Sequence, residues 1–127
     1  MGYTTAFSGK FRLSRALYAE EHNTLSKFVA ERHGGAVSMG AENDCPGFYC
    51  QWVPTADGKH IKWDGAEKFY NYVEWLNLII DRFLEPWGIT ASGVIRYEGE
   101  DGQIRGKIKL EKSLMTITKF RPRKYPQ

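Results

Sequence analysis

Residues 63–88 read WDGAEKFYNYVEWLNLIIDRFLEPWG and hold the longest helical pattern in the chain. Apolar side chains recur there at intervals of three and four residues, which is typical of a helix with one buried face. These side chains are Phe69, Tyr72, Val73, Leu76, Ile79, Ile80 and Phe83. Asp64 followed three residues later by Glu67 resembles a capping box, and Pro86 with Gly88 is a stop signal. We therefore predict one long helix that begins at Asp64, ends before Pro86 and forms the spine of the core.

Tyr70, Trp75 and Leu78 fall outside the apolar face of this predicted helix. Two interpretations stay open for them. Either the helix is buried on two sides, or it presents an aromatic edge to a partner. Tyr70 and Trp75 are therefore candidate partner-binding residues, with ordinary packing as the alternative.

A hairpin is predicted just before this helix. Residues 48–53 and 60–63 flank Asp57-Gly58, a pair favoured in two-residue type I′ turns. Such a turn places Trp52 opposite Trp63 and Pro54 opposite Ile61. The two tryptophans then belong to the hairpin and core, or they form a stacking surface for a base or a sugar.

The N-terminal third begins with a strand and continues with a helix. Apolar and polar residues alternate from Phe7 to Leu13, as in a half-buried strand. Helical spacing follows from about Tyr18 to His33, where Gly34-Gly35 ends it. Residues 35–47 are polar and contain glycine, which indicates a loop.

The last third is predicted to be a meander of three strands. Asp101-Gly102 turns residues 93–99 into residues 104–111, and a second tight turn lies near Lys112-Ser113. The predicted pairs are Ile95 with Ile108, Tyr97 with Gly106, Glu98 with Arg105, Ile108 with Ile117, and Leu110 with Met115. Alternation then assigns one face to the core, namely Ile95, Tyr97, Ile108, Leu110, Met115 and Ile117. The opposite face carries Arg96, Glu98, Arg105, Lys107, Lys109, Thr116, Thr118 and Phe120.

The order of these elements, β-α-β-β-α-β-β-β, predicts the α+β class. We expect a mostly antiparallel sheet of about six strands with two helices packed on one face. The length of 127 residues suits a single globular domain over residues 1–127, with a short basic tail at 119–127. Neither a membrane span nor a signal peptide is evident, so we expect a cytoplasmic protein.

Positive charge gathers in the C-terminal part of the chain. From Gly93 onward nine basic side chains stand against four acidic ones, whereas the whole chain has a net charge of only +3. Basic side chains interleaved with aromatic ones can hold phosphates and stack on bases. The candidate binding residues are Arg96, Arg105, Lys107, Lys109, Phe120 and Arg121. The alternative is a solvated face whose lysines guard the sheet against aggregation.

Motifs for catalysis are not found. The sequence contains no phosphate-binding loop, no nucleophile elbow and no zinc pattern, and Cys45 and Cys50 lack further ligands nearby. We therefore expect a protein that is not an enzyme, with no cofactor, no metal site and no catalytic residue.

The segment from Gly47 to Gly106 resembles a family of small uncharacterised proteins of bacteriophages, prophages and bacterial genomes. The family pattern joins a CQWVP hairpin, a WDG-x-EKFYNYVEWL helix and an F-L-x-PWG end, here residues 50–54, 63–76 and 83–88. The chain departs from it at Tyr18-Ala19-Glu20, where the family often has a Thr-Pro-Glu cap. The resemblance implies a phage or mobile-element context and transfers no catalytic residue, because no activity is established for the family.

Two functions follow from these observations. The first is a non-enzymatic phage accessory protein that binds a host protein, for instance an anti-CRISPR-like inhibitor of a bacterial defence system. A net charge of +3 argues against mimicry of DNA in such a role. The alternative is a protein that binds nucleic acid or a nucleotide signal through its basic sheet face. No membrane partner is expected, and a homodimer through an edge strand or the long helix stays open.

Overall fold

The fold is an α+β arrangement built on one six-stranded sheet, as the element order predicts. The computed structural model describes residues 3–33 and 45–123. The sheet has the strand order β2-β3-β1-β4-β5-β6, and all neighbouring strands are antiparallel. Its strands are β1 (Thr5–Leu13), β2 (Trp52–Pro54), β3 (His60–Trp63), β4 (Ala91–Gly99), β5 (Arg105–Glu111) and β6 (Leu114–Lys119). The helices are α1 (Ala19–Ala30) and α2 (Tyr72–Ile79), and α2 continues into one π-helical turn, η3 (Ile80–Leu84).

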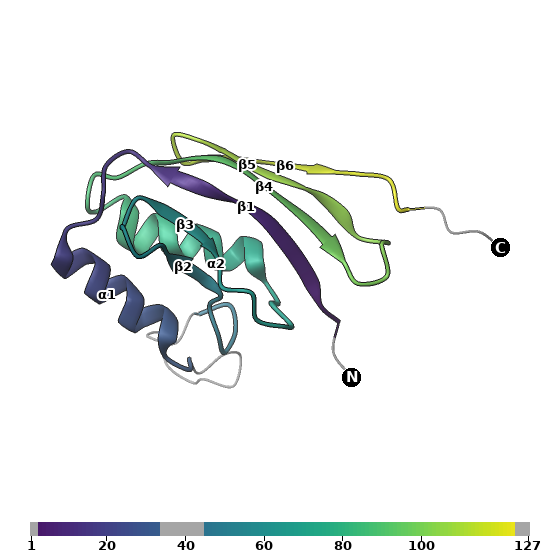
Figure 1. Cartoon of the computed structure of the whole chain (residues 1–127), viewed down its shortest axis with the longest axis horizontal. Coiled ribbons are helices and arrows are strands. Elements are labelled where there is room, and N and C mark those ends of the chain that lie inside the picture. Colours follow the sequence, from purple (N-terminus) through teal and green to yellow (C-terminus); the bar gives the residue numbers. More distant parts are fainter. Residues whose placement is uncertain (1–2, 34–44, 124–127) are drawn as a thin grey trace.

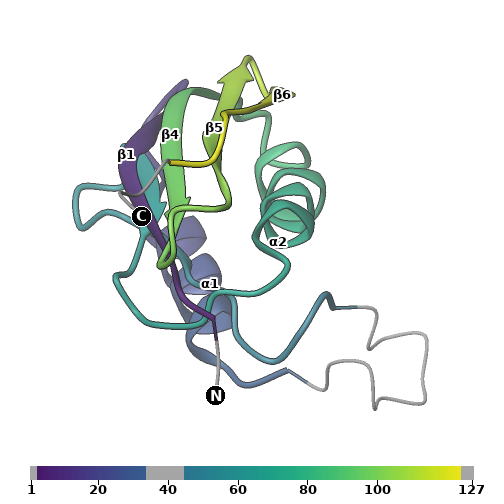
Figure 2. The same ribbon diagram turned by 90° about the vertical axis from the view of Figure 1, so that its right-hand side faces the viewer.

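Both helices lie on the same side of the sheet (Figures 1 and 2). The core forms between them and the sheet face that they cover. Its largest fully buried side chains come from every layer: Phe11, Leu25, Trp52, Ile61, Phe69, Trp75, Leu76, Ile79, Leu84, Ile89, Ile95 and Ile108. Within the described ranges, no helix is long and apolar enough to cross a membrane.

Strand β1 holds the two halves of the sheet together. All nine of its residues pair with β4, and its end also pairs with β3 through Phe11 opposite Ile61. Strand β3 precedes helix α2 in the chain and β4 follows it, so β1 joins the first hairpin to the C-terminal meander. Phe7, Phe11 and Leu13 point into the core, because side chains alternate along a strand.

The predicted strand pairings of both Asp-Gly hairpins are confirmed, although neither Asp-Gly pair forms the predicted two-residue turn. Gly102 has a φ of 72°, its N–H donates to Gly99 O at 2.9 Å, and Asp101 is not among the described residues with positive φ. The type I′ turn at Asp57-Gly58 is wrong for the same reason. Trp52 lies opposite Trp63, and Tyr97 lies opposite Gly106. Gly58 has a φ of 72°, and its N–H donates to Thr55 O at 2.9 Å. Asp57 is not among the described residues with positive φ, as a type I′ turn would require. A four-residue loop with a left-handed glycine therefore gives the same register.

The turn between β5 and β6 does have the two-residue form. Lys112 and Ser113 both have positive φ, at 48° and 69°, as a type I′ turn requires. Ile108 pairs with Ile117 and Leu110 with Met115, as predicted. The assignment of Ile117 to the core is wrong, because its side chain is 39% exposed. The physical reason is its position on β6, the last strand of the sheet, where one side has no neighbouring strand.

The long helix predicted from Asp64 is wrong at its start. Helix α2 begins only at Tyr72, and Lys68 and Asn71 before it have positive φ values of 60° and 57°. Asp64 Oδ1 accepts a hydrogen bond from Ala66 N at 2.8 Å, a local turn rather than a capping box. The amide of Gln51 donates to Glu67 O at 2.9 Å, which ties this segment to the hairpin instead of to a helix.

Trp52 and Trp63 are part of the packing between hairpin and helix. Trp52 is buried, and its Nε1–H donates to Tyr72 O at 2.8 Å, at the first residue of α2. Trp63 is half-buried, and its Nε1–H donates to Gln51 Oε1 at 3.0 Å. The packing interpretation is therefore confirmed for Trp52, which offers no ring face to a base or a sugar.

Candidate functional site

The sheet has one face that the helices cover and one that they leave open (Figures 1 and 2). Strand pairing arranges the side chains of the open face in rows across the sheet. One row is Ser8, Arg96, Lys107 and Thr118, and the next is Lys10, Val94, Lys109 and Thr116. Arg12 follows Lys10 along β1 on the same face. We name the five cations Lys10, Arg12, Arg96, Lys107 and Lys109 the basic face.

The centre of the basic face has positive charge and no acid. Arg96 and Lys107 are directly paired residues, so their Cβ atoms lie about 5 Å apart. Like charges in such a position destabilise a sheet. Within the part of the chain that the structure describes, none of the five cations has an acidic partner within ion-pair distance. An anion placed on these rows would remove the repulsion between them.

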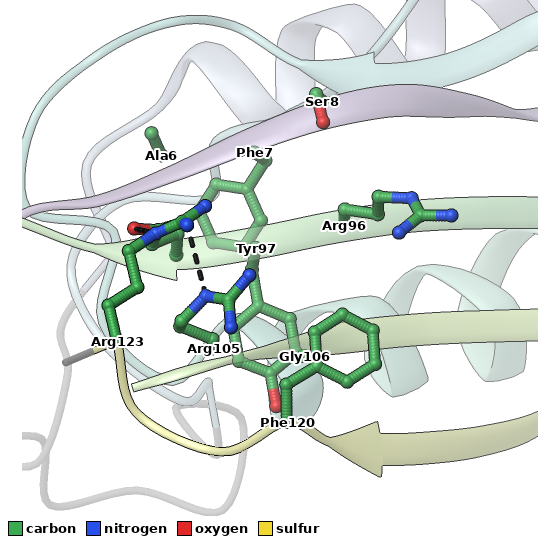
Figure 3. A pocket seen from close by; sticks show the side chains of 10 residues that line it. Ala6, Phe7, Ser8, Arg96, Tyr97, Arg105, Gly106, Phe120 and Arg123 are labelled. Atoms are coloured by element: carbon green, nitrogen blue, oxygen red, sulfur yellow. Dashed lines mark hydrogen bonds and ion pairs between the residues drawn. The ribbon is translucent and has the colours of Figure 1, made fainter. Parts of the chain in front are cut away.

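A pocket of about 340 Å³ lies at one end of this face (Figure 3). Arg96 borders it on the side of the basic face, and Arg105, Phe120 and Arg123 border it on the other. Glu98 also lines it and binds two of these guanidinium groups. Arg123 Nε lies 2.5 Å from Glu98 Oε2, and Arg105 Nε lies 3.4 Å from Glu98 Oε1.

Arg105, one of the predicted binding cations, is engaged within the protein. Besides Glu98, its Nη1 donates to Arg121 O at 3.1 Å, and its guanidinium lies 5.6 Å from the centre of the Phe120 ring. Its charge is shared with the Glu98 carboxylate. Arg105 therefore positions the segment after β6, and Arg96, Lys107 and Lys109 remain as the cations available to a ligand.

The predicted basic tail divides into two parts. Phe120 is half-buried, and its N–H donates to Arg105 O at 2.8 Å, so the chain continues beside β5 after β6 ends. Arg123 N donates to Gly102 O at 3.0 Å and extends this contact. Arg121 lies on this segment and is exposed. Residues 124–127 of the predicted tail lie outside the described residues.

Tyr70 and Trp75 are not an aromatic edge of the long helix. Trp75 is 0% exposed and lies against Phe28 and His33 at the end of α1, so its prediction as a partner contact on the surface is wrong. The end of helix α1 thus covers the side of α2 that carries Trp75, a side for which the sequence pattern predicted no neighbour. Tyr70 is 52% exposed but lies in the segment before α2.

No family model, curated protein or solved structure matches this chain. The resemblance to a phage family accordingly stays a prediction, and the site is interpreted from its own residues. Among residues 3–33 and 45–123, no group of three His, Cys, Asp or Glu side chains is placed to hold a metal ion.

Sequence patterns alone did not identify Lys10, Arg12 and Arg123 as site residues. The first two belong to β1, which reaches the C-terminal cations only through its pairing with β4. The alternating pattern of residues 7–13 was the signal that could have identified Lys10 and Arg12. Its polar residues all lie on the face of the strand that points away from the core. Nothing in the sequence pairs Arg123 with Glu98, because that contact spans 25 positions.

We expect Glu98→Gln to loosen residues 120–123 from β4. The ion pairs with Arg123 and Arg105 lower the pKa of the Glu98 carboxyl below its usual range, with the Arg123 hydrogen bond as the larger cause. The contact is therefore complete above the ordinary glutamate pKa and is lost as the pH falls through the lowered value. Amide exchange of Arg123, whose N–H bonds to Gly102 O, should be faster in the variant at neutral pH.

Two comparisons check this expectation. The difference between variant and wild type should shrink in strongly acidic solution, where Glu98 is protonated in the wild type as well. The amide of Lys109, inside the paired part of β5, is the internal control and should not change. Equal Arg123 exchange in both proteins at neutral pH would show that Glu98 does not hold this segment.

Proposed function

We propose that the protein acts by binding rather than by catalysis, and that its basic face binds the phosphates of a nucleic acid. One observation carries the proposal. Arg96 and Lys107 form a directly opposed pair of cations, with Lys109 and Lys10 in the next row, on a sheet face without a covering helix. Such a pair of like charges does not stabilise the fold. It does attract a ligand with regularly spaced negative charges.

The spacing of the cations supports an extended polyanion. Neighbouring strands lie about 4.8 Å apart, and residues two apart on one strand lie about 6.7 Å apart. Long, flexible lysine and arginine side chains on such a lattice can each reach a different phosphate. Binding then releases counterions from the nucleic acid, which makes the affinity depend on salt concentration. At one end, the ring of Phe120 at the border of the first pocket offers a surface for a base.

Fluorescence anisotropy with labelled single-stranded and duplex DNA tests this function. The wild-type protein should bind in low salt, and its affinity should fall steeply between about 50 and 200 mM salt. The triple variant Arg96→Gln, Lys107→Gln, Lys109→Gln should bind at least about tenfold more weakly. Its slope of log affinity against log salt should be smaller by about two to three, because each lost contact removes close to one released counterion.

A matched control removes charge elsewhere. Lys27 is an exposed lysine in the last turn of α1, on the side of the sheet that the helices cover. Lys27→Gln should leave both the affinity and the salt slope almost unchanged. Absence of DNA binding by the wild type in low salt, or equal binding by the triple variant and Lys27→Gln, would contradict the proposal.

A protein partner is the second candidate function, and the open edge of β6 favours it. This strand has six residues without proline, and Leu114 on it is 74% exposed. The other sheet edge, β2, has only three residues and ends at Pro54, which cannot donate a backbone hydrogen bond. A partner that adds a strand to β6 would complete the sheet. The resemblance implies a phage or mobile-element context, and within that context the partner we propose is a component of a bacterial defence system that this contact inhibits.

An affinity pull-down from bacterial lysate, with and without nuclease, distinguishes the two functions. A near-stoichiometric protein that survives nuclease and is lost with Ile117→Pro would favour the β6 edge, since the N–H of Ile117 points away from β5 and proline removes this donor from the open edge. If bound molecules are recovered only when nuclease is left out, and are lost with the triple variant of the basic face, nucleic acid is the favoured ligand.

A further inference from the structure

A second pocket lies on the helix side of the sheet and shares no residue with the basic face. Its volume is about 520 Å³, within the usual range for sites that bind small molecules. It lies between residues 46–51, residues 67–71 and helix α2. The residues that matter for its chemistry are Gly47, Phe48, Tyr49, Lys68, Tyr70 and Trp75.

The wall of this pocket contains a buried hydrogen-bond donor that has no acceptor. Trp75 is 0% exposed, and its Nε1 has no partner among the residues that the structure describes. Trp52 and Trp63, by contrast, donate their Nε1–H groups to oxygen atoms at 2.8 and 3.0 Å. Buried polar groups are nearly always satisfied, because an unpaired one costs free energy. A donor kept in this state needs an explanation.

The glycine at position 47 keeps the space beside this donor open. A Cβ atom added to Gly47 would lie 3.6 Å from Trp75 Nε1. Both residues line the pocket, so the indole N–H lies at the pocket wall and not deep inside the core. The nitrogen itself is closed to solvent, so an acceptor atom in the pocket reaches it only when the wall beside Gly47 moves aside.

Aromatic rings surround this donor at the surface. Tyr49 and Tyr70 are more than half exposed and offer ring surface to a ligand, whereas the exposed Phe48 ring has the Arg32 guanidinium 4.5 Å from its centre. Two of the supporting segments are held by hydrogen bonds. Tyr70 Oη accepts from Tyr3 N at 3.2 Å, and Asn71 Nδ2 donates to Pro46 O at 2.7 Å. The rings thus belong to anchored segments.

We propose that this pocket binds the base of a nucleotide. A nucleobase is planar and stacks on aromatic rings, and its edge carries carbonyl oxygens and ring nitrogens that accept hydrogen bonds. Such an acceptor pairs with Trp75 Nε1–H, while the ring lies against the aromatic side chains. Glu67 and Lys68 both line the pocket, so the base and not the phosphate supplies the recognition. The inference does not depend on the basic face, since no residue is shared.

The indole N–H signals in an NMR spectrum of ¹⁵N-labelled protein test the proposal directly. The chain has four tryptophans, and the signal lost in Trp75→Phe identifies Trp75. Titration with AMP, GMP, CMP and UMP, each alone, should shift the Trp75 signal in a saturable way for at least one of them. The signal of Trp87, which does not line the pocket, is the internal control.

Variants then measure the contribution of each group. Trp75→Phe keeps an aromatic ring but removes the donor, so the affinity for the best mononucleotide should fall about tenfold, as for the loss of one buried hydrogen bond. Tyr70→Ala removes a stacking ring at an exposed position and should also weaken binding. Tyr18→Ala, at an exposed tyrosine outside the pocket, should not.

Each outcome supports or overturns the proposal. No saturable shift of any of the four indole N–H signals with any of the four mononucleotides at millimolar concentration would overturn it, and this outcome can be read even if Trp75→Phe fails to fold. Equal affinities of wild type and Tyr70→Ala would also overturn it. The triple variant of the basic face should bind the mononucleotide as the wild type does, so failure of nucleic-acid binding on that face is a separate result.

Discussion

Trp52→Ala is expected to lower the free energy of unfolding by about 3–5 kcal/mol, the range measured for removal of a large buried aromatic side chain. The Trp52 side chain is 1% exposed and lies edge-on to Phe7 and Phe69, with ring centres 5.2 Å away in each case. Its loss leaves a cavity between the hairpin and the helix. It also leaves Tyr72 O without its 2.8 Å hydrogen bond at the start of α2.

Urea unfolding followed by circular dichroism measures this change. Domains of this size have a total stability of only about 5–15 kcal/mol, so the variant should be partly unfolded at 37 °C. Trp52→Phe is the matched control, since it keeps a ring in the core and should cost less than Trp52→Ala. A loss below about 1 kcal/mol for Trp52→Ala would mean that the hairpin does not pack as described.

Gly106→Ala is expected to be the second most damaging change, although it adds only one methyl group. A Cβ at this position would lie 2.5 Å from Tyr97 Oη and would also contact the backbone oxygen of Thr118. The Tyr97 ring covers Gly106 from the paired position on β4, and Thr118 O belongs to the neighbouring strand. Because that backbone atom cannot rotate away, we expect β6 to shift and the stability to fall by about 1–3 kcal/mol.

Gly47→Ala provides the comparison for this substitution. A Cβ there has its nearest neighbour at 3.6 Å, an ordinary contact distance. Its unfolding free energy should remain within about 0.5 kcal/mol of the wild type. Equal stabilities of Gly106→Ala and Gly47→Ala would show that β4, β5 and β6 tolerate a side chain at position 106. Hydrogen exchange in β6 should rise in Gly106→Ala, since its pairing with β5 is disturbed first.

Local information in the sequence was sufficient for the hairpins. A turn of known length fixes which residues are opposite one another, and side chains alternate with a period of two. Tyr97 opposite Gly106 and Ile108 opposite Ile117 follow from these two facts alone. The wrong turn type at Asp57-Gly58 did no harm to the register, because the four-residue loop keeps the same opposite pairs.

The long central pattern misled the prediction where tertiary contacts replaced helical ones. Apolar spacing continues back to Phe69, and Phe69 is indeed buried, but it reaches the core from an irregular segment. Gln51 and Trp52 on the hairpin bind the backbone at Glu67 and Tyr72, so residues 64–71 follow the hairpin. Periodicity records which side chains are buried and not which backbone atoms are bonded.

The sequence by itself determined the α+β class, the registers within the hairpins, and three of the five cations of the basic face, Arg96, Lys107 and Lys109, because these depend on neighbours in the chain. Only the tertiary structure decided the rest. Pairing of β1 with β4 added Lys10 and Arg12 to the same face. The ion pair with Glu98 engages Arg105 within the protein. Packing against α1 buried Trp75 and left its indole N–H at a pocket wall. These outcomes depend on contacts between residues far apart in sequence, which no local pattern encodes.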